Sequence, residues 1–330
     1  MVEVVSLDED DRRILHAIQL DGRASFARIA TVLGLSERAV SRRYHRLRSR
    51  LVLRVVGVTR HDPRAQADWL LRITAPPASV DALARALAAR NDTSWIASLA
   101  GSGELICMLR TTATTREAGD VLEQFRRRAN IGTMTAQRLL TPVAGVGGWP
   151  GRLQALTLDE QAAIAPAPAT LTPERSWTDT PRSDADERLL ALLAIDGRMS
   201  IARLAAVSGI PESTVRRRIG ELIERGVLMF EVEVDPKFYG CNLDVICWLD
   251  VRPSALRVVT DAIGSHAEVA FAATTTGASN VLTLLEFTAA DELHDYLADR
   301  IGGLPGVHHV RSEIISGWIK RAGPILIPRA

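Results

Sequence analysis

The stretch "SERAVSRRYHRLRSRLVL", residues 36–53, decides the fold, because the chain nearly repeats it as "PESTVRRRIGELIERGVL", residues 211–228. Aligned without a gap at an offset of 175, residues 21–53 and 196–228 share 17 identities in 33 positions. Beyond this stretch the offset becomes 176, and apolar positions still correspond. We therefore expect a tandem duplication of a unit of about 140 residues.

Each copy opens with three predicted helices. In the first copy an apolar stripe follows the acidic start "SLDEDD", and Ser6 with Glu9 has the spacing of a capping box. The next helix, in "SFARIATVLG", has Ser25 as its cap and ends at Gly34, and a third helix begins after Ser36. Two short helices joined by a glycine-containing turn form a helix-turn-helix, and the second copy has the same parts.

The rest of each copy alternates between strand and helix patterns. In the first copy the order is "DWLLRIT", "SVDALARALAAR", "TSWIASLA", "ELICMLRTT", "TREAGDVLEQFRRR" and "GTMTAQRLL". This βαββαβ order is typical of a ferredoxin-like sandwich, in which two helices cover one face of an antiparallel sheet. We predict an α+β fold of two tandem units, each a winged-type helix-turn-helix domain followed by a ferredoxin-like βαββαβ domain.

A segment rich in Pro, Gly, Ala and Thr separates the copies and has the composition of a connector. Within it, Thr157 and Glu160 have the capping-box spacing of one short helix. The predicted domains are helix-turn-helix domain 1 at 1–60, ferredoxin-like domain 1 at 61–141, a linker at 142–182, helix-turn-helix domain 2 at 183–235 and ferredoxin-like domain 2 at 236–330.

The third helix of each copy carries a basic face. On a helical wheel Val40, Tyr44 and Leu47 form the core stripe, so the arginines point away from the core. In a helix-turn-helix the N-terminal half of this face enters the DNA major groove, where arginine bonds guanine and serine serves several bases. We expect contacts with double-stranded DNA from Ser36, Arg38, Ser41, Arg42, Arg43, His45 and Arg46 in the first copy, and from Ser213, Thr214, Arg216, Arg217 and Arg218 in the second.

Charge separates the two copies. Arg38, Ser41 and Arg42 are expected to contact bases, whereas the arginines beside them are expected to contact phosphates; these are Arg43, Arg46, Arg48, Arg50 and Arg54. Residues 36–54 hold seven arginines and one acid, an excess that favours DNA over a merely solvated face. Residues 183–235 hold seven basic and ten acidic residues, so we expect the first copy to supply most of the affinity and the second to refine specificity.

The stretches "LDEDDRRILHAIQLDGRASFARIATVLGLSERAVSRRYHRL" and "DADERLLALLAIDGRMSIARLAAVSGIPESTVRRRIGELIERGVL" resemble the DNA-binding part of the Lrp/AsnC (feast/famine) family of transcriptional regulators. The resemblance implies paired regulatory domains, a near-palindromic operator, and an amino acid or related small molecule bound at the regulatory-domain interface. Because one chain holds two copies, we expect an intrachain pseudo-dimer that suits a near-palindromic or an asymmetric operator, with further association into homo-oligomers.

The same resemblance points to the loops between the second and third strands of each sandwich, which correspond to the family's effector-proximal "TG.yD" segment. Neither loop has the Tyr-Asp pair, and Glu104 and Asn280 stand near the position of the Asp. Tight hairpin turns that need glycine are the alternative interpretation. The implied effector-binding residues are Gly101, Ser102, Gly103, Glu104, Thr275, Thr276, Gly277, Ser279 and Asn280.

Other chemistry finds little support in the sequence. No nucleophile with a base, phosphate loop, paired carboxylates or metal-ligand spacing stands out, so we expect no enzyme activity, no cofactor and no metal site. One alternative is a siroheme decarboxylase, a class that shares this architecture and would need a histidine and an arginine beside aromatic residues; residues 93–109 and 269–285 have neither. Another is a corepressor that uses both domains only for protein contacts.

Composition bounds the remaining choices. Apolar residues make up 47% of the chain and charged residues 24%, as in an ordinary globular protein. The start "MVEVVSLDEDDRR" has no basic and apolar leader, and no run of about 18 apolar residues follows, so we expect no membrane insertion and a cytoplasmic location. Cys107, Cys241 and Cys247 suit buried reduced thiols.

Overall fold

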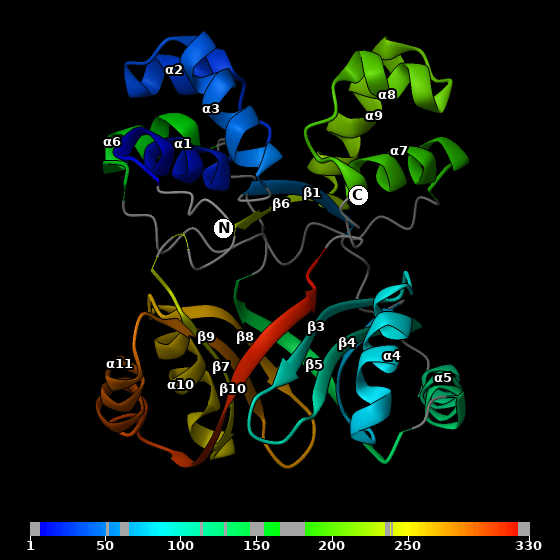
Figure 1. Ribbon diagram of the computed structural model, residues 1–330, viewed down its shortest axis with the longest axis vertical. Coiled ribbons are helices and arrows are strands. Elements are labelled where there is room, and N and C mark those ends of the chain that lie inside the picture. Colours follow the sequence, from blue (N-terminus) through cyan, green and yellow to red (C-terminus); the bar gives the residue numbers. More distant parts are fainter. Residues whose placement is uncertain are drawn as a thin grey trace. The chain divides into compact units, whose positions relative to one another are not determined.

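The computed structural model describes residues 7–50, 53–59, 66–112, 115–128, 131–145, 155–165, 182–234, 238 and 240–322. They form two compact units, each assembled from both halves of the chain. The helical unit comprises residues 1–61 and 147–239, and the barrel unit comprises residues 62–146 and 240–330. Figure 1 shows the elements of both units, which are described separately below.

Two three-helix clusters make up most of the helical unit. The first head consists of α1 (Glu9–Leu20), α2 (Phe26–Leu33) and α3 (Glu37–Ser49), and the second head of α7 (Asp184–Ile195), α8 (Ile201–Ser208) and α9 (Glu212–Glu224). In the first head the predicted stripes are buried, including Ile14, Ile29 and Val40. Corresponding side chains, among them Leu189, Leu204 and Val215, fill the core of the second head.

The cap of α1 differs from the predicted one. Asp8 is the N-cap, and its side chain and that of Asp11 make the reciprocal hydrogen bonds of a capping box. The observed capping box therefore lies two residues after the predicted one of Ser6 and Glu9. Ser6 itself lies outside the described residues. The corresponding positions of the second head, Ser183 and Asp186, cap α7 in the same way.

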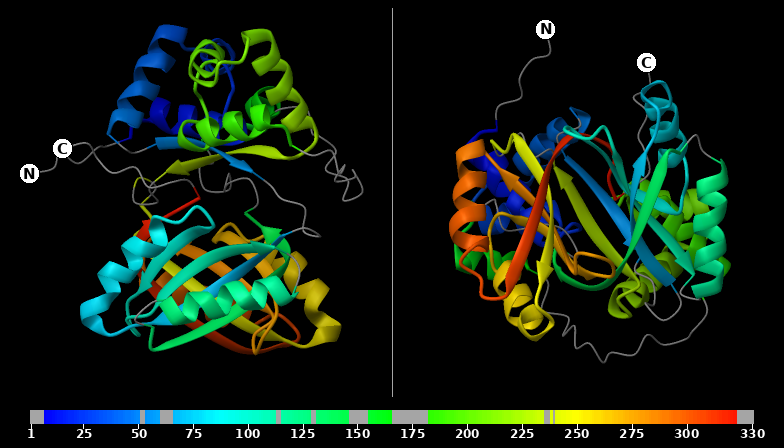
Figure 2. Two further views of the ribbon diagram at one scale, coloured as in Figure 1. Left: turned by 90° about the vertical axis from the view of Figure 1, so that its right-hand side faces the viewer. Right: turned by 90° about the horizontal axis from the view of Figure 1, so that it is seen from below.

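One strand from each head joins the two heads. β1 (Leu53–Thr59) pairs antiparallel with β6 (Leu228–Val234) as a two-stranded ribbon, with Val56 opposite Glu231. These two central residues differ by the repeat offset of 175, so the ribbon has a local pseudo-twofold axis between them. Figures 1 and 2 show the helices of both heads on one face of this ribbon.

The first head also carries the predicted linker helix, α6 (Leu158–Ile164), which begins with the expected capping box of Thr157 and Glu160. Ile164 is fully buried in the core of the first head. On the surface Arg13 pairs with Glu160 at 2.5 Å, and Arg28 donates to the Ala163 carbonyl at 2.8 Å. The connector therefore contributes packing to the first head.

The barrel unit contains two βαββαβ sandwiches. The first has β2 (Gln66–Thr74), α4 (Pro77–Ala88), β3 (Thr93–Leu99), β4 (Leu105–Thr112), α5 (Thr115–Arg128) and β5 (Thr133–Ala144). The second has β7 (Leu243–Val251), η3 (Pro253–Ala255), α10 (Leu256–Gly264), β8 (Val269–Thr275), β9 (Val281–Phe287), α11 (Ala290–Asp295), the π-helical turn η4 (Tyr296–Ile301) and β10 (Val307–Lys320). Both follow the order expected of a ferredoxin-like sandwich.

The two sheets close into one barrel of strand order β10-β3-β4-β2-β5-β8-β9-β7. Figure 2 shows the helices lying outside the strands. The sheets join at two seams, where β10 pairs with β3 and β5 pairs with β8. The seams are equivalent, because the pair Ile315 and Leu99 at the first corresponds, at the repeat offset of 176, to the pair Leu139 and Thr275 at the second. Apolar side chains from both sheets, including Trp248, fill the space between them.

β5 runs past the predicted start of the linker at residue 142. Pro142 is opposite Ala273 and Ala144 opposite Ala272, with register shifts on both sides of the proline. A proline cannot donate to a regular ladder, but an irregular register tolerates it. Because the following segment is rich in Pro and Gly, the predicted end of this strand at Leu140 is four residues too early.

Cys107, Cys241 and Cys247 are buried, and none of them forms a disulfide within the described part of the chain. Burial raises the pKa of Cys107 and of Cys247 to about 12. Among the described helices, none has the length and apolar character needed to cross a membrane.

Candidate nucleic-acid interface and effector loops

The turn between α2 and α3 sets the position of α3. Gly34 ends α2 with a φ of 69°, a left-handed conformation that suits glycine, and Ser36 then caps α3 by accepting from the Ala39 backbone N–H. Val40, Tyr44 and Leu47 are buried, as the wheel predicted, so the opposite face of α3 points to solvent.

The first half of this exposed face presents two unpaired cations. Arg38 and Arg42 are exposed and form no ion pair or hydrogen bond with any described side chain. Ser41 between them is half-buried, and the exposed His45 lies edge-on to Tyr44 with ring centroids 5.4 Å apart. The predicted base-contacting residues are thus together, and the two arginines have no competing partner among the described residues.

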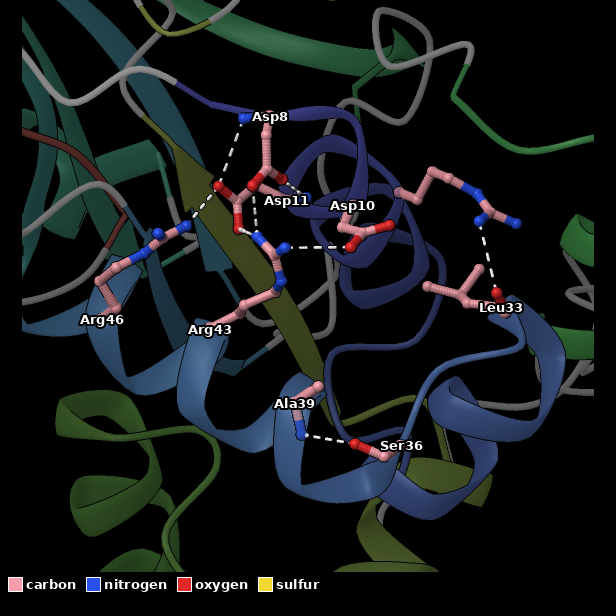
Figure 3. A network of polar contacts seen from close by, with 9 residues as sticks. Asp8, Asp10, Asp11, Leu33, Ser36, Ala39, Arg43 and Arg46 are labelled. Atoms are coloured by element: carbon pink, nitrogen blue, oxygen red, sulfur yellow. Dashed lines mark hydrogen bonds and ion pairs between the residues drawn. The ribbon is translucent and has the colours of Figure 1, made fainter.

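Arg43 and Arg46 have internal partners (Figure 3). Arg43 Nη1 lies 2.6 Å from a carboxylate oxygen of Asp8 and 2.9 Å from one of Asp11, and its Nη2 lies 3.0 Å from Asp10. Arg46 also pairs with Asp11, whose side chain is fully buried. The acids at the start of α1 neutralise much of the charge of Arg43 and Arg46, and the predicted contact of these two arginines with phosphates stays a prediction.

These ion pairs shift the pKa values of both the arginine and the aspartate. The hydrogen bond with Asp8, reinforced by Asp11, raises the pKa of the Arg43 guanidinium despite partial burial. Burial by itself would raise the pKa of Asp8, but hydrogen bonds from the Arg43 side chain and the Asp11 backbone outweigh it and lower that pKa. The network therefore holds α3 against the start of α1 as a set of fixed charges.

Two further arginines predicted to contact phosphates pair with the other head. Arg48 lies 2.7 Å from Asp196, and Arg54 of β1 lies 3.4 Å from Glu233 of β6. Asp196 and Glu233 lie far from residues 36–54 in the sequence, so they were not included in the charge count for that segment. Their negative charges reduce its excess of positive charge.

The second head has the same frame with different polar groups. Pro211 precedes α9 and makes no side-chain cap, and Arg218 lies 3.6 Å from Asp186, as Arg43 does beside Asp11 but at a longer distance. Arg217 is exposed and pairs with Glu221 one turn later at 2.5 Å. Ser213 and Arg216 are exposed, Thr214 is half-buried, and Arg216 is without a partner among the described residues.

In the barrel unit the first predicted effector loop is tied to neighbouring strands by charge. Glu104 pairs with Arg72 of β2, which also lies 2.8 Å from Glu313 of β10. Ser102 donates to Glu313 at 3.1 Å, and Gly103 has a φ of 65°. Gly101 is exposed at the tip.

The second loop is tied by neutral groups. Asn280 donates to the Val251 carbonyl at 2.6 Å and accepts from the Val251 N–H at 2.9 Å. Thr275 donates to the Ser279 carbonyl at 2.9 Å, and the Thr276 N–H donates to the Arg138 carbonyl at 2.9 Å. Gly277 has a φ of 106°, which favours glycine.

Both loops meet the opposite sandwich at equivalent places. The Ala100 N–H donates to the Ile314 carbonyl at 2.8 Å, which is the counterpart at offset 176 of the bond from Thr276 to Arg138. Between the sheets the Arg72 guanidinium lies 4.4 Å from the ring centroid of Trp248, its own counterpart. The indole N–H of Trp248 donates to Gln137 at 3.1 Å.

Sequence reasoning missed these inter-sheet residues. A single charge at Arg72 within the apolar run "LLRIT" was the available signal. The pairing itself depends on which strand faces which, and no local pattern contains that information.

Two helix-turn-helix heads with exposed arginines, together with paired ferredoxin-like sandwiches, define a DNA-binding protein with α+β ligand-binding-type domains. Sequence comparison agrees: the AsnC-type helix-turn-helix domain family matches residues 7–48, the winged helix-turn-helix DNA-binding family matches 182–229, and the Lrp/AsnC ligand binding domain family matches 244–325. The matched families identify an Lrp/AsnC-type helix-turn-helix at residues 7–48 and an Lrp/AsnC-type ligand binding domain at residues 244–325, as in transcriptional regulators of this kind.

Relatives of the chain are about as long as one half of it. An uncharacterized HTH-type transcriptional regulator of Pyrococcus furiosus is 29% identical over 139 residues, which cover 42% of this chain and 93% of the relative. The HTH-type transcriptional regulator LrpA of Pyrococcus abyssi is 27% identical over 136 residues, covering 41% of this chain and 96% of LrpA.

Solved structures of a siroheme decarboxylase resemble the fold of the whole chain. The siroheme decarboxylase NirDL matches 95% of this chain and 93% of its own with a TM-score of 0.62, at 15% sequence identity. At this identity the likeness concerns the fold alone.

Proposed function

We propose that this chain is a sequence-specific transcriptional regulator in which both heads of one chain read a single operator. The observation that carries the proposal is that Arg38 and Arg42, on the N-terminal half of α3, are exposed and have no partner in the part of the chain that the structure describes. Arginines in this position can bond guanine bidentately in the major groove.

The other predicted residues take different roles in the proposal. Ser41 joins Arg38 and Arg42 at the base edges, while Ser36 holds the start of α3, where backbone N–H groups attract a phosphate. Arg43, Arg46 and, in the second head, Arg218 orient their helices through the acids beside them. In the second head the base-contacting residues are Ser213, Thr214, Arg216 and Arg217.

We further propose that two complete Lrp/AsnC-type units lie in tandem on the chain, divided near residues 60, 144, 182 and 235, where the second boundary follows the observed end of β5 and the others are those predicted from the sequence. The correspondence of each relative to less than half of this chain supports this organisation. So does the ribbon of β1 and β6, whose register obeys the repeat offset. The two units then form an intrachain pseudo-dimer, and chains associate further into homo-oligomers.

An amino acid or a related small molecule is proposed as the effector at the two loops. The first loop presents the Glu104, Arg72 and Glu313 charges, whereas the second presents the neutral Asn280 and Thr276. The two sites therefore differ in the ligand groups that they prefer. Thermal-shift screening of amino acids and related acids tests this, with Glu104→Gln as the variant that should abolish a response at the first loop.

A gel-shift titration at fixed salt tests the main proposal. Genomic fragments retained by the full chain supply the DNA, and the double variant Arg38→Ala/Arg42→Ala should lose more than about 30-fold in affinity, since each bidentate base contact contributes about 1–3 kcal/mol. Arg85→Ala is the matched control, because Arg85 is an exposed arginine of α4 in the barrel unit. Equal losses in the two variants would contradict the proposal, and failure to retain any fragment would favour a corepressor that binds only proteins.

Siroheme decarboxylation is the second candidate, and the whole-chain fold likeness to NirDL favours it. Against it, residues 93–109 and 269–285 offer no histidine or arginine for a macrocycle and its carboxylates. We propose that the chain has no such activity. Siroheme added to the protein should then show no shift of its Soret band, and a shift with loss of carboxyl groups from the tetrapyrrole would reverse this choice.

A further inference from the structure

Two arginines at equivalent positions, Arg23 and Arg198, each donate hydrogen bonds to a turn of the other head, and we call these contacts the clasps. Arg23 donates through Nη1 to the Gly197 carbonyl at 2.6 Å and through Nη2 to the Met199 carbonyl at 3.2 Å. Arg198 donates to the Gly22 and Ala24 carbonyls, each at 2.7 Å. Arg23 and Arg198 are counterparts at the repeat offset, so each head reaches into the same turn of the other.

The surroundings of these guanidinium groups are unlike those of surface arginines. Arg198 lies 4.7 Å from the ring centroid of Phe26 and 5.1 Å from that of Tyr44, and Arg23 lies 5.4 Å from that of Phe230. Neither forms an ion pair with a described carboxylate. Burial lowers the pKa of both guanidinium groups. A rigid fork that donates to two carbonyls fixes direction as well as distance.

The backbone approach at the clasp is close. A Cβ at Gly22 would lie 2.8 Å from Cβ of Phe230, and one at Gly57 would lie 2.9 Å from Cβ of Leu193. Both clashes would be between different heads, so glycine is needed for the heads to meet at this distance.

The ribbon by itself leaves the angle between the heads open. A two-stranded ribbon twists and bends more readily than a larger sheet. The clasps lie at the turns that follow α1 and α7 and pack beside the ribbon, where the Gly197 N–H donates to the Val55 carbonyl at 2.8 Å and Arg23 lies over Phe230 of β6. They add side-chain hydrogen bonds between the helical parts of the two heads to the backbone pairing of the strands.

We infer that Arg23 and Arg198 are positioning residues that fix the distance and angle between α3 and α9, and thereby set the spacing of the two half-sites that the protein accepts. The inference rests on the proposed function, because it needs both heads on one DNA. Neither side chain touches DNA in this scheme. Adding one base pair between half-sites moves them by roughly 3.4 Å and turns them by about 35°, so a fixed pair of helices tolerates only one spacing.

The test uses the full chain and a set of DNA duplexes in which the spacer of the selected operator is shortened or lengthened by one and two base pairs. The wild type should lose about tenfold or more in affinity for each base pair of change. The double variant Arg23→Gln/Arg198→Gln should bind all spacers within about threefold of one another, and Arg23→Lys/Arg198→Lys should recover little of the selectivity, because lysine lacks the fork. A variant that keeps the steep dependence, or loses affinity equally on every spacer, overturns the inference.

A measurement without DNA separates this inference from the proposed function. Thr31 on α2 and Ala206 on α8 are exposed counterparts outside the clasp and the base-contacting set, and cysteines placed there can carry spin labels. The distance distribution between the labels should be narrow in the otherwise wild-type chain and broad in the Arg23→Gln/Arg198→Gln background. Unchanged width overturns the inference even if DNA binds. A wild type that binds no DNA specifically overturns the proposed function, and with it the half-site claim.

Discussion

The first and second heads share a frame but differ in how their charges are used. Both have a left-handed glycine before the third helix and a buried stripe along it. In the first head three aspartates at the start of α1 pair with Arg43, and neither Arg38 nor Arg42 has a partner among the described residues. In the second head a single aspartate, Asp186, pairs with Arg218 at a longer distance, and Arg217 pairs with Glu221. The comparison teaches that a repeated fold can carry two unequal binding surfaces.

The largest effect expected from this comparison is on stability. Asp11→Asn removes the buried carboxylate between Arg43 and Arg46, and breaking such a buried pair costs about 3 kcal/mol. Asp186→Asn in the second head should cost less, about 1 kcal/mol, because its carboxylate is the capping partner of Ser183 and lies farther from Arg218. Hydrogen exchange resolved by peptide measures each head in the full chain. If Asp11→Asn reduced protection in α1 only as much as Asp186→Asn reduces it in α7, the predicted difference in stability between the two heads would be wrong.

The next effect is on DNA affinity. Arg42→Ala should cost about 2 kcal/mol, roughly 30-fold, because it removes an unpaired arginine from the base-contacting half of α3. Arg217→Ala should cost less, because Arg217 must first leave Glu221. A gel-shift titration of both variants on one operator at one salt concentration makes the measurement, with Arg85→Ala as control. Equal losses would contradict unequal heads.

The caps allow a smaller test in opposite directions. Ser36→Ala removes the side-chain cap of α3 and should cost about 1 kcal/mol, as typical N-cap deletions do. Pro211→Ser gives α9 the cap that it lacks and should stabilise the second head by a similar or smaller amount. Thermal unfolding of the full chain, with exchange in α3 and α9 as the local readout, follows both changes. Destabilisation by Pro211→Ser would mean that proline's fixed φ matters more there than a cap.

The smallest effect is a dependence on pH that only the first head should show. His16 of α1 is buried, and burial lowers its pKa below 6.5; the corresponding residue in α7 is Ala191. Because the folded state disfavours the charged ring, His16 contributes fully to stability above pH 6.5, and the contribution is lost as the pH falls through the lower folded-state value. His16→Leu should flatten the change in unfolding free energy between pH 7.5 and about 5. A steeper change in the variant would refute the assignment.

Much of the frame could be predicted because it depends on local signals. Ser25, Ser36 and Thr157 cap the expected helices, and Gly34 ends α2, since caps and left-handed turns are decided by a few adjacent residues. The strand order within each sandwich followed from the alternation of patterns. The end of β5 was misplaced, because Pro142 sits in an irregular register that composition does not show.

Which arginines pair with acids could not be predicted by counting charges along one helix. Arg43 and Arg48 have acids as partners that are 32 and 148 residues away in the chain. Likewise Arg72 of β2 pairs with Glu313 of β10, a strand of the other sandwich, and Arg23 donates to carbonyls in a turn of the other head. Tertiary pairing decided which arginines remain available, and two of the seven counted in the first copy, Arg38 and Arg42, lead the proposed interface.

Selection of binding sites from random DNA by the wild type and by Arg42→Ala tests most directly whether two unequal heads of one chain read one operator. The wild type should select one bipartite motif with a strong and a weak half at a fixed spacing. Arg42→Ala should lose the strong half and keep the weak one. Two identical halves that weaken together in the variant would contradict the account, since they would mean that first heads from two separate chains read the site.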